Sequence, residues 1–185
     1  MAKLKEPKPA LMFFYEIKEG DVLKQRAKSN KSTSGGGARD VRIRPAEKFS
    51  AILAAMFPGK TSREGVWEGS ISWEDDDGNV EQATIELWRP TEARPGEARI
   101  GRINRIAAWD VHTKQYTEDL GRGKKWFYLL VKDTDGVVWA RLLYEENLPN
   151  EDPRVRRYVE QRIKDTHPHH HVRGTLNFIT GEEYP

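Results

Sequence analysis

The amino-acid sequence predicts a mainly β protein, a mostly antiparallel barrel or sandwich of about seven strands with two short peripheral helices. Apolar and polar residues alternate over several segments, most clearly over 66–73 and 83–88, and this two-residue period is typical of half-buried strands. Turn sequences such as Asp77-Gly78 separate the strands. Strands do not alternate with long helical patterns, which would have indicated a parallel sheet.

The expected strands follow one another along most of the chain. The first is apolar and aromatic, the second alternates arginine with Val41 and Ile43, and the later ones return after turns at 75–79 and 133–136. In order they are 11–17, 41–45, 66–73, 83–88, 98–106, 126–131 and 137–144. A further segment, 175–179, is either a last strand or part of a tail.

Two segments have the pattern of short amphipathic helices. The first begins at Pro45, presents Phe49, Leu53 and Met56 on one face, and ends at Phe57-Pro58-Gly59. The second spans 151–164, and its apolar edge consists of Val155, Val159 and Ile163. Asp152 has the side chain of an N-cap and Pro153 suits the first turn that follows it.

The 185 residues suffice for one domain with a substantial core. We expect a flexible basic arm at 1–10, the domain itself at 11–165 and a C-terminal tail at 166–185. No apolar run approaches the roughly 20 residues that span a bilayer. The chain contains no cysteine, which excludes disulfides and thiolate metal sites. A cytoplasmic protein without membrane contact is therefore expected.

Basic residues are concentrated in two segments. Residues 18–44 contain eight Lys or Arg and three acids, and residues 89–105 contain five arginines and two acids. The compensating acids lie mainly at 74–77 and 145–152. Such segregation favours a positive surface that binds a polyanion such as nucleic acid, although charged loops are also common on any protein surface.

The order of these segments resembles the N-terminal effector domain of EcoRII-type restriction endonucleases, which shares the DNA-binding pseudobarrel of the plant B-three transcription factors. The resemblance covers roughly residues 11–165. The matching pieces are the aromatic first strand, Ser29-Asn30 before Ser34-Gly35-Gly36-Gly37, Val41-Arg42-Ile43-Arg44-Pro45, Met56-Phe57-Pro58, the alternating hairpin, 94–102 and 127–133. The resemblance implies a seven-stranded pseudobarrel that grips the major groove with two arms, within a bacterial restriction or phage-defence system.

The resemblance places the first arm at 28–42 and the second at 89–102, within the segments that are rich in basic residues. The DNA contacts expected in the first arm are Lys28, Asn30, Lys31, Ser32, Thr33, Ser34, Gly36, Arg39 and Arg42. Those expected in the second arm are Arg89, Arg94, Glu97, Arg99 and Arg102. Glycines let backbone N–H groups approach phosphates, hydroxyls add donors, and Lys and Arg supply charge.

Arg94, Glu97 and Arg99 have a spacing similar to that of the family's base-reading cluster. A guanidinium matches the N7 and O6 acceptors of guanine, and a glutamate accepts from the amine of cytosine. The sequence departs from the family pattern at Pro95-Gly96 and at Ala98. The alternative for Glu97 is a plain ion pair with Arg94 or Arg99.

We therefore expect a non-catalytic module that binds double-stranded DNA at a short site, modified or unmodified. Its partner would be a separate nuclease, methyltransferase or helicase subunit. Lys124, in the basic turn 122–125, is either a further backbone contact or a solvated side chain. The histidines of 167–171 do not lie on a predicted helix or strand that would bring their side chains together around a metal ion. Neither a metal nor another cofactor is expected.

Two other functions stay open. One is a protein-interaction module on the same barrel, which would use Trp67 and the acidic stretches as contacts. The other is a small metal-dependent nuclease that would use the tripeptide Glu16-Ile17-Lys18.

Overall fold

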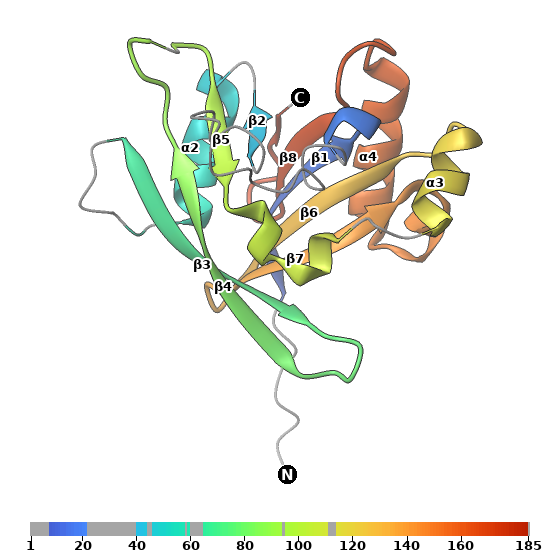
Figure 1. Ribbon diagram of the computed structural model, residues 1–185, viewed down its shortest axis with the longest axis horizontal. Helices are drawn as coiled ribbons and strands as arrows, with labels where there is room; N and C mark the ends of the chain where they lie inside the picture. The colour runs from blue at the N-terminus through green and yellow to red at the C-terminus, as the bar shows by residue number, and fades with distance from the viewer. Residues whose placement is uncertain are drawn as a thin grey trace, which may run out of the picture.

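The computed structural model describes residues 8–21, 40–43, 46–57, 59, 65–93, 95–110 and 114–184. As predicted, the described chain is mainly β, and it forms one curled open sheet with the strand order β2-β5-β4-β3-β7-β6-β1-β8-β9 (Figure 1). The strands are β1 (Pro9–Ile17), β2 (Val41–Ile43), β3 (Val66–Glu74), β4 (Val80–Trp88), β5 (Ala98–Gly101), β6 (Trp126–Asp133), β7 (Val138–Tyr144), β8 (Arg173–Asn177) and β9 (Glu183–Tyr184). Their pairing is antiparallel except between β3 and β7.

The prediction of seven strands was wrong, because the sheet formed by the described residues has nine. The two additional strands, β8 and β9, come from the segment 166–185, which was expected to be a tail. β8 pairs with β1, with Met12 opposite Leu176, so the sheet extends through the C-terminal segment to residue 184. β1 is buried along most of its length, and the buried backbone N–H and C=O groups on both edges of a strand need hydrogen-bonding partners.

The two predicted helices are present as α2 (Ala46–Met56) and α4 (Pro153–Asp165), and α3 (Lys114–Gly121) is a helix that was not predicted. Asp152 caps α4 as predicted, since its carboxylate accepts a 2.8 Å hydrogen bond from the Arg154 amide. The sequence of α3, KQYTEDLG, has no apolar stripe that would have indicated a helix. Burial of Tyr116 and Asp119 holds α3 instead, and the Asp119 carboxylate accepts from the indole of Trp126 at 2.9 Å.

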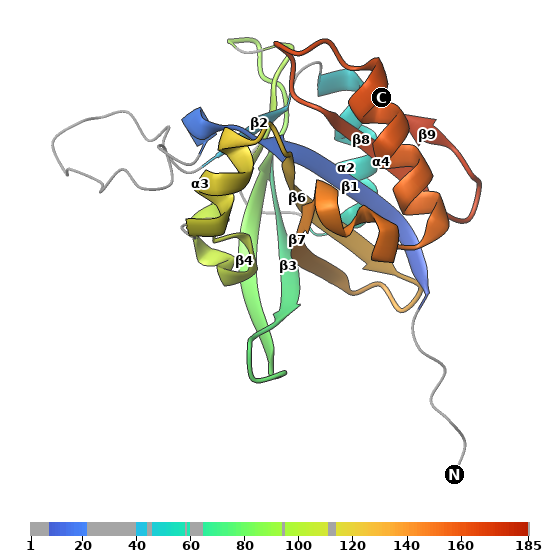
Figure 2. The ribbon, with the colours of Figure 1, turned by 90° about the vertical axis from the view of Figure 1, so that its right-hand side faces the viewer.

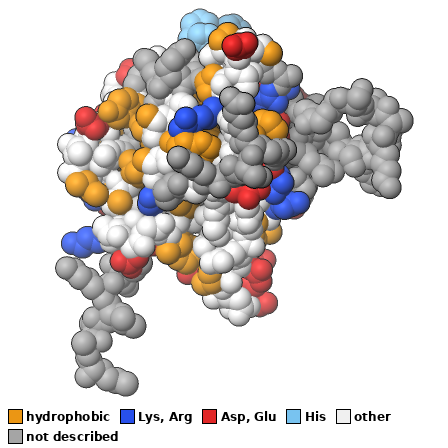
Figure 3. Space-filling view, turned by 90° about the vertical axis from the view of Figure 1, so that its left-hand side faces the viewer, with side chains coloured by type: hydrophobic (Ala, Val, Ile, Leu, Met, Phe, Trp, Pro, Cys, Tyr) orange, Lys and Arg blue, Asp and Glu red, His pale blue; other side chains and the backbone are white. Residues whose placement is uncertain are grey.

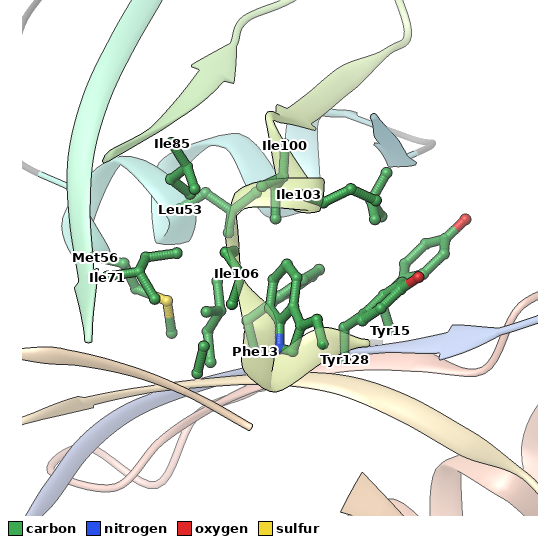
Figure 4. Close-up of a cluster of buried hydrophobic side chains, with 14 of the residues drawn as sticks. Phe13, Tyr15, Leu53, Met56, Ile71, Ile85, Ile100, Ile103, Ile106 and Tyr128 are labelled. Atoms are coloured by element: carbon green, nitrogen blue, oxygen red, sulfur yellow. The ribbon is translucent and has the colours of Figure 1, made fainter. Parts of the chain in front are cut away.

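The sheet separates two hydrophobic cores. Alternate residues of β1 serve each of them: Phe13 enters the larger core, which α2 covers, and Phe14 enters the smaller core under α4. Figure 4 shows Leu53 and Met56 of α2 within the larger core, together with side chains from the strands. In Figure 2, α4 lies against the part of the sheet that contains β1 and β8. The two-residue period of a strand thus explains how one strand supports both layers.

The sheet opens between β3 and β7, which pair only at Ser72 and Trp139. Two short 3-10 turns, Ile103–Arg105 and Ala107–Trp109, follow β5 and pack against this opening. Trp109 is 1% exposed, and its indole N–H donates to the carbonyl of Arg141 on β7 at 3.1 Å. The prediction of a strand over 98–106 was therefore wrong after Gly101, where the chain turns into the first 3-10 segment.

Candidate nucleic-acid interface

The ends of the two predicted arms meet in the sheet. β2 pairs with β5, and Arg42 at the end of the first arm lies directly opposite Arg99 in the second. Val41, Ile43 and Ile100 alternate with these arginines and are buried in the larger core. The alternation therefore turns both arginines to the opposite face of the two strands.

Most of the first arm lies outside the described residues. This applies to Lys28, Asn30, Lys31, Ser32, Thr33, Ser34, Gly36 and Arg39, and also to Arg94 of the second arm. The structure describes the remaining predicted contacts, which are Arg42, Arg89, Glu97, Arg99, Arg102 and Lys124.

Glu97 is a partner of Arg99. Its carboxylate accepts from Nε of Arg99 at 2.7 Å, and Nε of Arg42 lies 4.0 Å away. Arg99 also approaches Asp40, at 3.5 Å. Glu97 is only 3% exposed, so its carboxylate is occupied within the protein, as the ion-pair alternative predicted. The Arg99 side chain is 16% exposed and that of Arg42 is 46% exposed, so Arg42 presents its charge to solvent more fully.

Arg102 is held at the other end of β5. It has φ 61° and is the one non-glycine residue with positive φ in the described chain. A left-handed conformation at such a residue costs on the order of 1 kcal/mol or more, and a compensating contact is expected. That contact is the 2.5 Å hydrogen bond from the Arg102 guanidinium to Glu86, and Glu68 lies 3.9 Å from the same group. The backbone turn and the ion pair together fix where this guanidinium lies.

Two clusters of ion pairs lie along β5 and are here together called the β5 network. One joins Arg42 and Arg99 to Glu97 and Asp40, and the other joins Arg102 to Glu68 and Glu86. Its four carboxylates outnumber its three arginines. Glu68 and Glu86 belong to β3 and β4, so a count of charges along the arm could not include them. The signal that could have found them is strand alternation, which puts Glu68 and Glu86 opposite each other on one face. On the face shown in Figure 3, Lys and Arg side chains are likewise interspersed with acidic and hydrophobic ones.

Arg89 presents a different kind of basic contact. It is exposed, and its guanidinium carbon lies 3.9 Å from the ring centroid of Trp67. Trp67 packs against the larger core, so its ring forms a fixed support for the cation. The Arg89 guanidinium thus covers the ring of Trp67, which was a candidate contact for a partner protein.

Lys124 is not near the described part of the second arm. It follows α3, on the opposite side of the molecule from β5 in Figure 1. It lines a hollow of about 450 Å³ together with Glu145, Glu146 and Glu160. These carboxylates make the hollow a poor site for phosphate.

The nuclease alternative gains no complete site from the described residues. The carboxylate of Glu16 accepts from Lys125 at 2.5 Å and from the amide of Val172 at 2.7 Å, so it is engaged in structural contacts. No group of three or more His, Asp or Glu in the described ranges is arranged to hold a metal ion.

A second hollow, of about 260 Å³, lies between β6, β7 and the start of α4 and is lined largely by Leu129, Val131, Trp139, Val155 and Phe178. The polar groups at this hollow bind one another. The guanidinium of Arg141 donates to both carboxylate oxygens of Glu151, at 2.7 and 2.5 Å. The Trp139 indole donates to Asp133 at 2.9 Å. The hollow therefore offers an apolar wall.

Comparison of the chain with protein-family models, with curated proteins and with solved structures finds no match. The resemblance to EcoRII-type effector domains therefore stays a prediction. Among the described helices none is long and apolar enough to cross a membrane.

Proposed function

We propose that this protein is a module that binds double-stranded DNA through two arms in the major groove, at a short modified or unmodified site. In this proposal the curled sheet is a pseudobarrel of the EcoRII effector type. The module would serve a bacterial restriction or phage-defence system in which a separate nuclease, methyltransferase or helicase acts on the DNA.

The observation that carries the proposal is the pairing of β2 with β5. It brings Arg42 opposite Arg99, although the two residues belong to different basic segments of the chain. Neighbouring strands lie about 4.8 Å apart. The major groove is about 12 Å wide, so side chains from two adjacent strands can enter it together.

The acids of the β5 network fit a role in selectivity. A guanidinium that is already bound to carboxylates gains less from a phosphate, so non-specific attraction is weaker at Arg99 than at Arg42. Glu97 also holds the plane of the Arg99 guanidinium, and a fixed guanidinium plane is what bidentate recognition of a guanine edge requires. Arg42 and Arg89 would supply the more exposed charge for backbone contacts.

A salt titration with a fluorescein-labelled 30-base-pair duplex tests the proposal, with binding followed by fluorescence anisotropy. We expect affinity to fall steeply with salt, and Arg42→Ala to reduce the slope of log K against log salt by about 0.9, the value for one lost phosphate contact. Arg157→Ala is the matched control, since Arg157 is a 75% exposed arginine on α4. Absence of binding at low salt would contradict the proposal, as would equal effects of the two substitutions.

Binding to a partner protein is the second candidate, and the apolar hollow beside α4 favours it. Apolar contacts weaken little with rising salt, whereas phosphate contacts weaken strongly. A protein that fails to bind the duplex at every salt concentration and retains a folded spectrum would favour this second candidate.

A further inference from the structure

The histidine-rich segment 166–172 lies at the same end of the molecule as the connection between β4 and β5. Figures 1 and 2 show both segments at the upper end of the molecule, and Figure 3 shows histidine side chains there. The segment joins α4 to β8. Asp21, the last described residue before the first predicted arm, contacts His171 of this segment at 3.2 Å. A duplex that engaged the β4–β5 connection would therefore lie at the same end of the molecule as this segment.

Several contacts hold the segment in one conformation. The ammonium group of Lys18 donates to the carbonyl of His170 at 2.9 Å and to that of Pro168 at 3.4 Å. The amide of His170 donates to the carbonyl of His167 at 2.8 Å. The ring of His171 stacks on Tyr15, with 4.8 Å between the centroids. Nδ1 of His167 also accepts from the amide of His169 at 3.4 Å. The imidazoles of three further histidines, including His167, remain exposed to solvent.

The three exposed imidazoles are those of His167, His169 and His170. The ring of His167 lies 5.2 Å from that of His169 and 5.6 Å from that of His170, measured between centroids. In the described chain no Asp or Glu is hydrogen-bonded to any of these three rings. Protonation would therefore concentrate positive charge at one point on the surface.

The neighbouring cations are also without acidic partners in the described part of the chain. Nε of Arg162 donates to the carbonyl of Arg173 at 3.1 Å, and Nε of Arg173 is buried without any acceptor. Burial lowers the pKa of the Arg173 guanidinium, which remains charged at neutral pH. This contrasts with Arg99, which has two carboxylate partners.

The acids around the segment are few and mostly engaged. Asp21 binds His171 and the amide of Lys18, and Asp165 accepts from Gln161 at 2.8 Å. Glu19, which follows Lys18 in the chain, is exposed to solvent. Glu16 also accepts from the amide of Val172, and it is paired with Lys125. These four acids are matched by Lys18, Lys125, Arg162 and Arg173, so the sign of the local charge depends on the histidines. Histidine is the side chain whose charge changes between pH 5 and 8.

We propose that segment 166–172, together with Lys18, Arg162 and Arg173, is a third contact with the DNA backbone, and that it strengthens as its histidines gain protons. The proposal depends on the DNA-binding function proposed above. It assigns to the segment the phosphate groups of the duplex as ligands, because imidazolium and guanidinium groups donate charge-assisted hydrogen bonds to phosphate oxygens.

The test compares the full-length protein with the triple variant His167→Asn, His169→Asn, His170→Asn, using the same labelled duplex at pH 5.5 and pH 7.5. Asparagine keeps these exposed positions polar, and His171 is retained because it stacks on Tyr15. If two phosphate contacts form on protonation, the slope of log K against log salt becomes deeper by about 1.8 at pH 5.5. Between 50 and 200 mM salt that difference corresponds to about tenfold more loss of affinity.

We expect the triple variant to bind as the parent does at pH 7.5 and to lack the additional affinity at pH 5.5. Equal gains for parent and variant would overturn the inference, as would a parent whose affinity does not change with pH. Loss of all duplex binding at both pH values would instead contradict the proposed function. Arg42→Ala further distinguishes a failure of this inference from a failure of the proposed function. This variant should bind the duplex more weakly at both pH values and keep the gain in affinity at pH 5.5.

Discussion

Replacing Glu97 with glutamine tests how the β5 network is held together. The Glu97 side chain is 2% exposed and binds Nε of Arg99 at 2.7 Å, so the substitution leaves a largely buried guanidinium without its nearest counter-charge. Breaking a fully buried pair in this way costs about 3–5 kcal/mol. Arg99 retains 16% exposure and keeps Asp40 at 3.5 Å, which reduces the expected cost to about 2 kcal/mol. For a protein of this size that cost corresponds to a decrease in Tm of about 4–8 °C.

The assay is a double-mutant cycle measured by urea unfolding, with Glu97→Gln and Arg99→Met as the single changes. Methionine keeps much of the volume of the arginine stem and removes the charge. We expect a coupling energy of about 2 kcal/mol, because the pair is close and shielded from water. The parallel cycle with Arg42→Ala should give less than about 0.5 kcal/mol, since that guanidinium is 46% exposed and 4.0 Å away. Similar coupling in both cycles would refute the reasoning that burial and distance set the strength of these pairs.

Two further substitutions test local features of the fold. Burial raises the pKa of the Asp152 carboxyl, but the hydrogen bonds and the charge of Arg154 together outweigh it and lower that pKa below its ordinary value of 3.8. Asp152→Ala should therefore lower the free energy of unfolding by about 1 kcal/mol at pH 7. Thermal unfolding measured as a function of pH should show the difference between parent and variant shrink as the pH falls below 3.8 and through the folded-state pKa. A difference independent of pH would exclude the carboxylate as the cap. Gly174→Ala should cost about 1–3 kcal/mol, because its Cβ would collide with the ring and hydroxyl of Tyr158, whereas Gly20→Ala, with open space around it, should be nearly neutral. A neutral Gly174→Ala would mean that β8 does not pack under α4.

The sequence predicted best those elements whose signals act within a few residues. The alternation of 66–73 and 83–88 around Asp77-Gly78 identified the hairpin of β3 and β4, and Gly78 adopts the positive φ that such a turn needs. Asp152 and Pro153 likewise identified the start of α4. Alternation and capping are local, so they are visible without the rest of the molecule.

Charge along the chain was a weaker guide to the candidate interface. It selected the segments that end in β2 and β5, and it identified Arg42 and Arg99 as residues of interest. It could not show that Glu86 neutralises Arg102, because these two residues are brought together by the pairing of β4 with β5. Charge along the chain also grouped Lys124 with the basic surface. That lysine instead lines a hollow together with acids from η3 (Glu145–Asn150) and α4.

By itself, then, the sequence determined the mainly β class, the hairpins, α2, α4 and the inward and outward faces of β2 and β5. Each of these follows from the period of the chain and from the conformational preferences of neighbouring residues. Only the tertiary structure decided that β8 and β9 complete the sheet, that α3 is a helix, and that Glu97 is a buried partner of Arg99. These features depend on burial and on contacts between distant segments, whose energies no local pattern encodes.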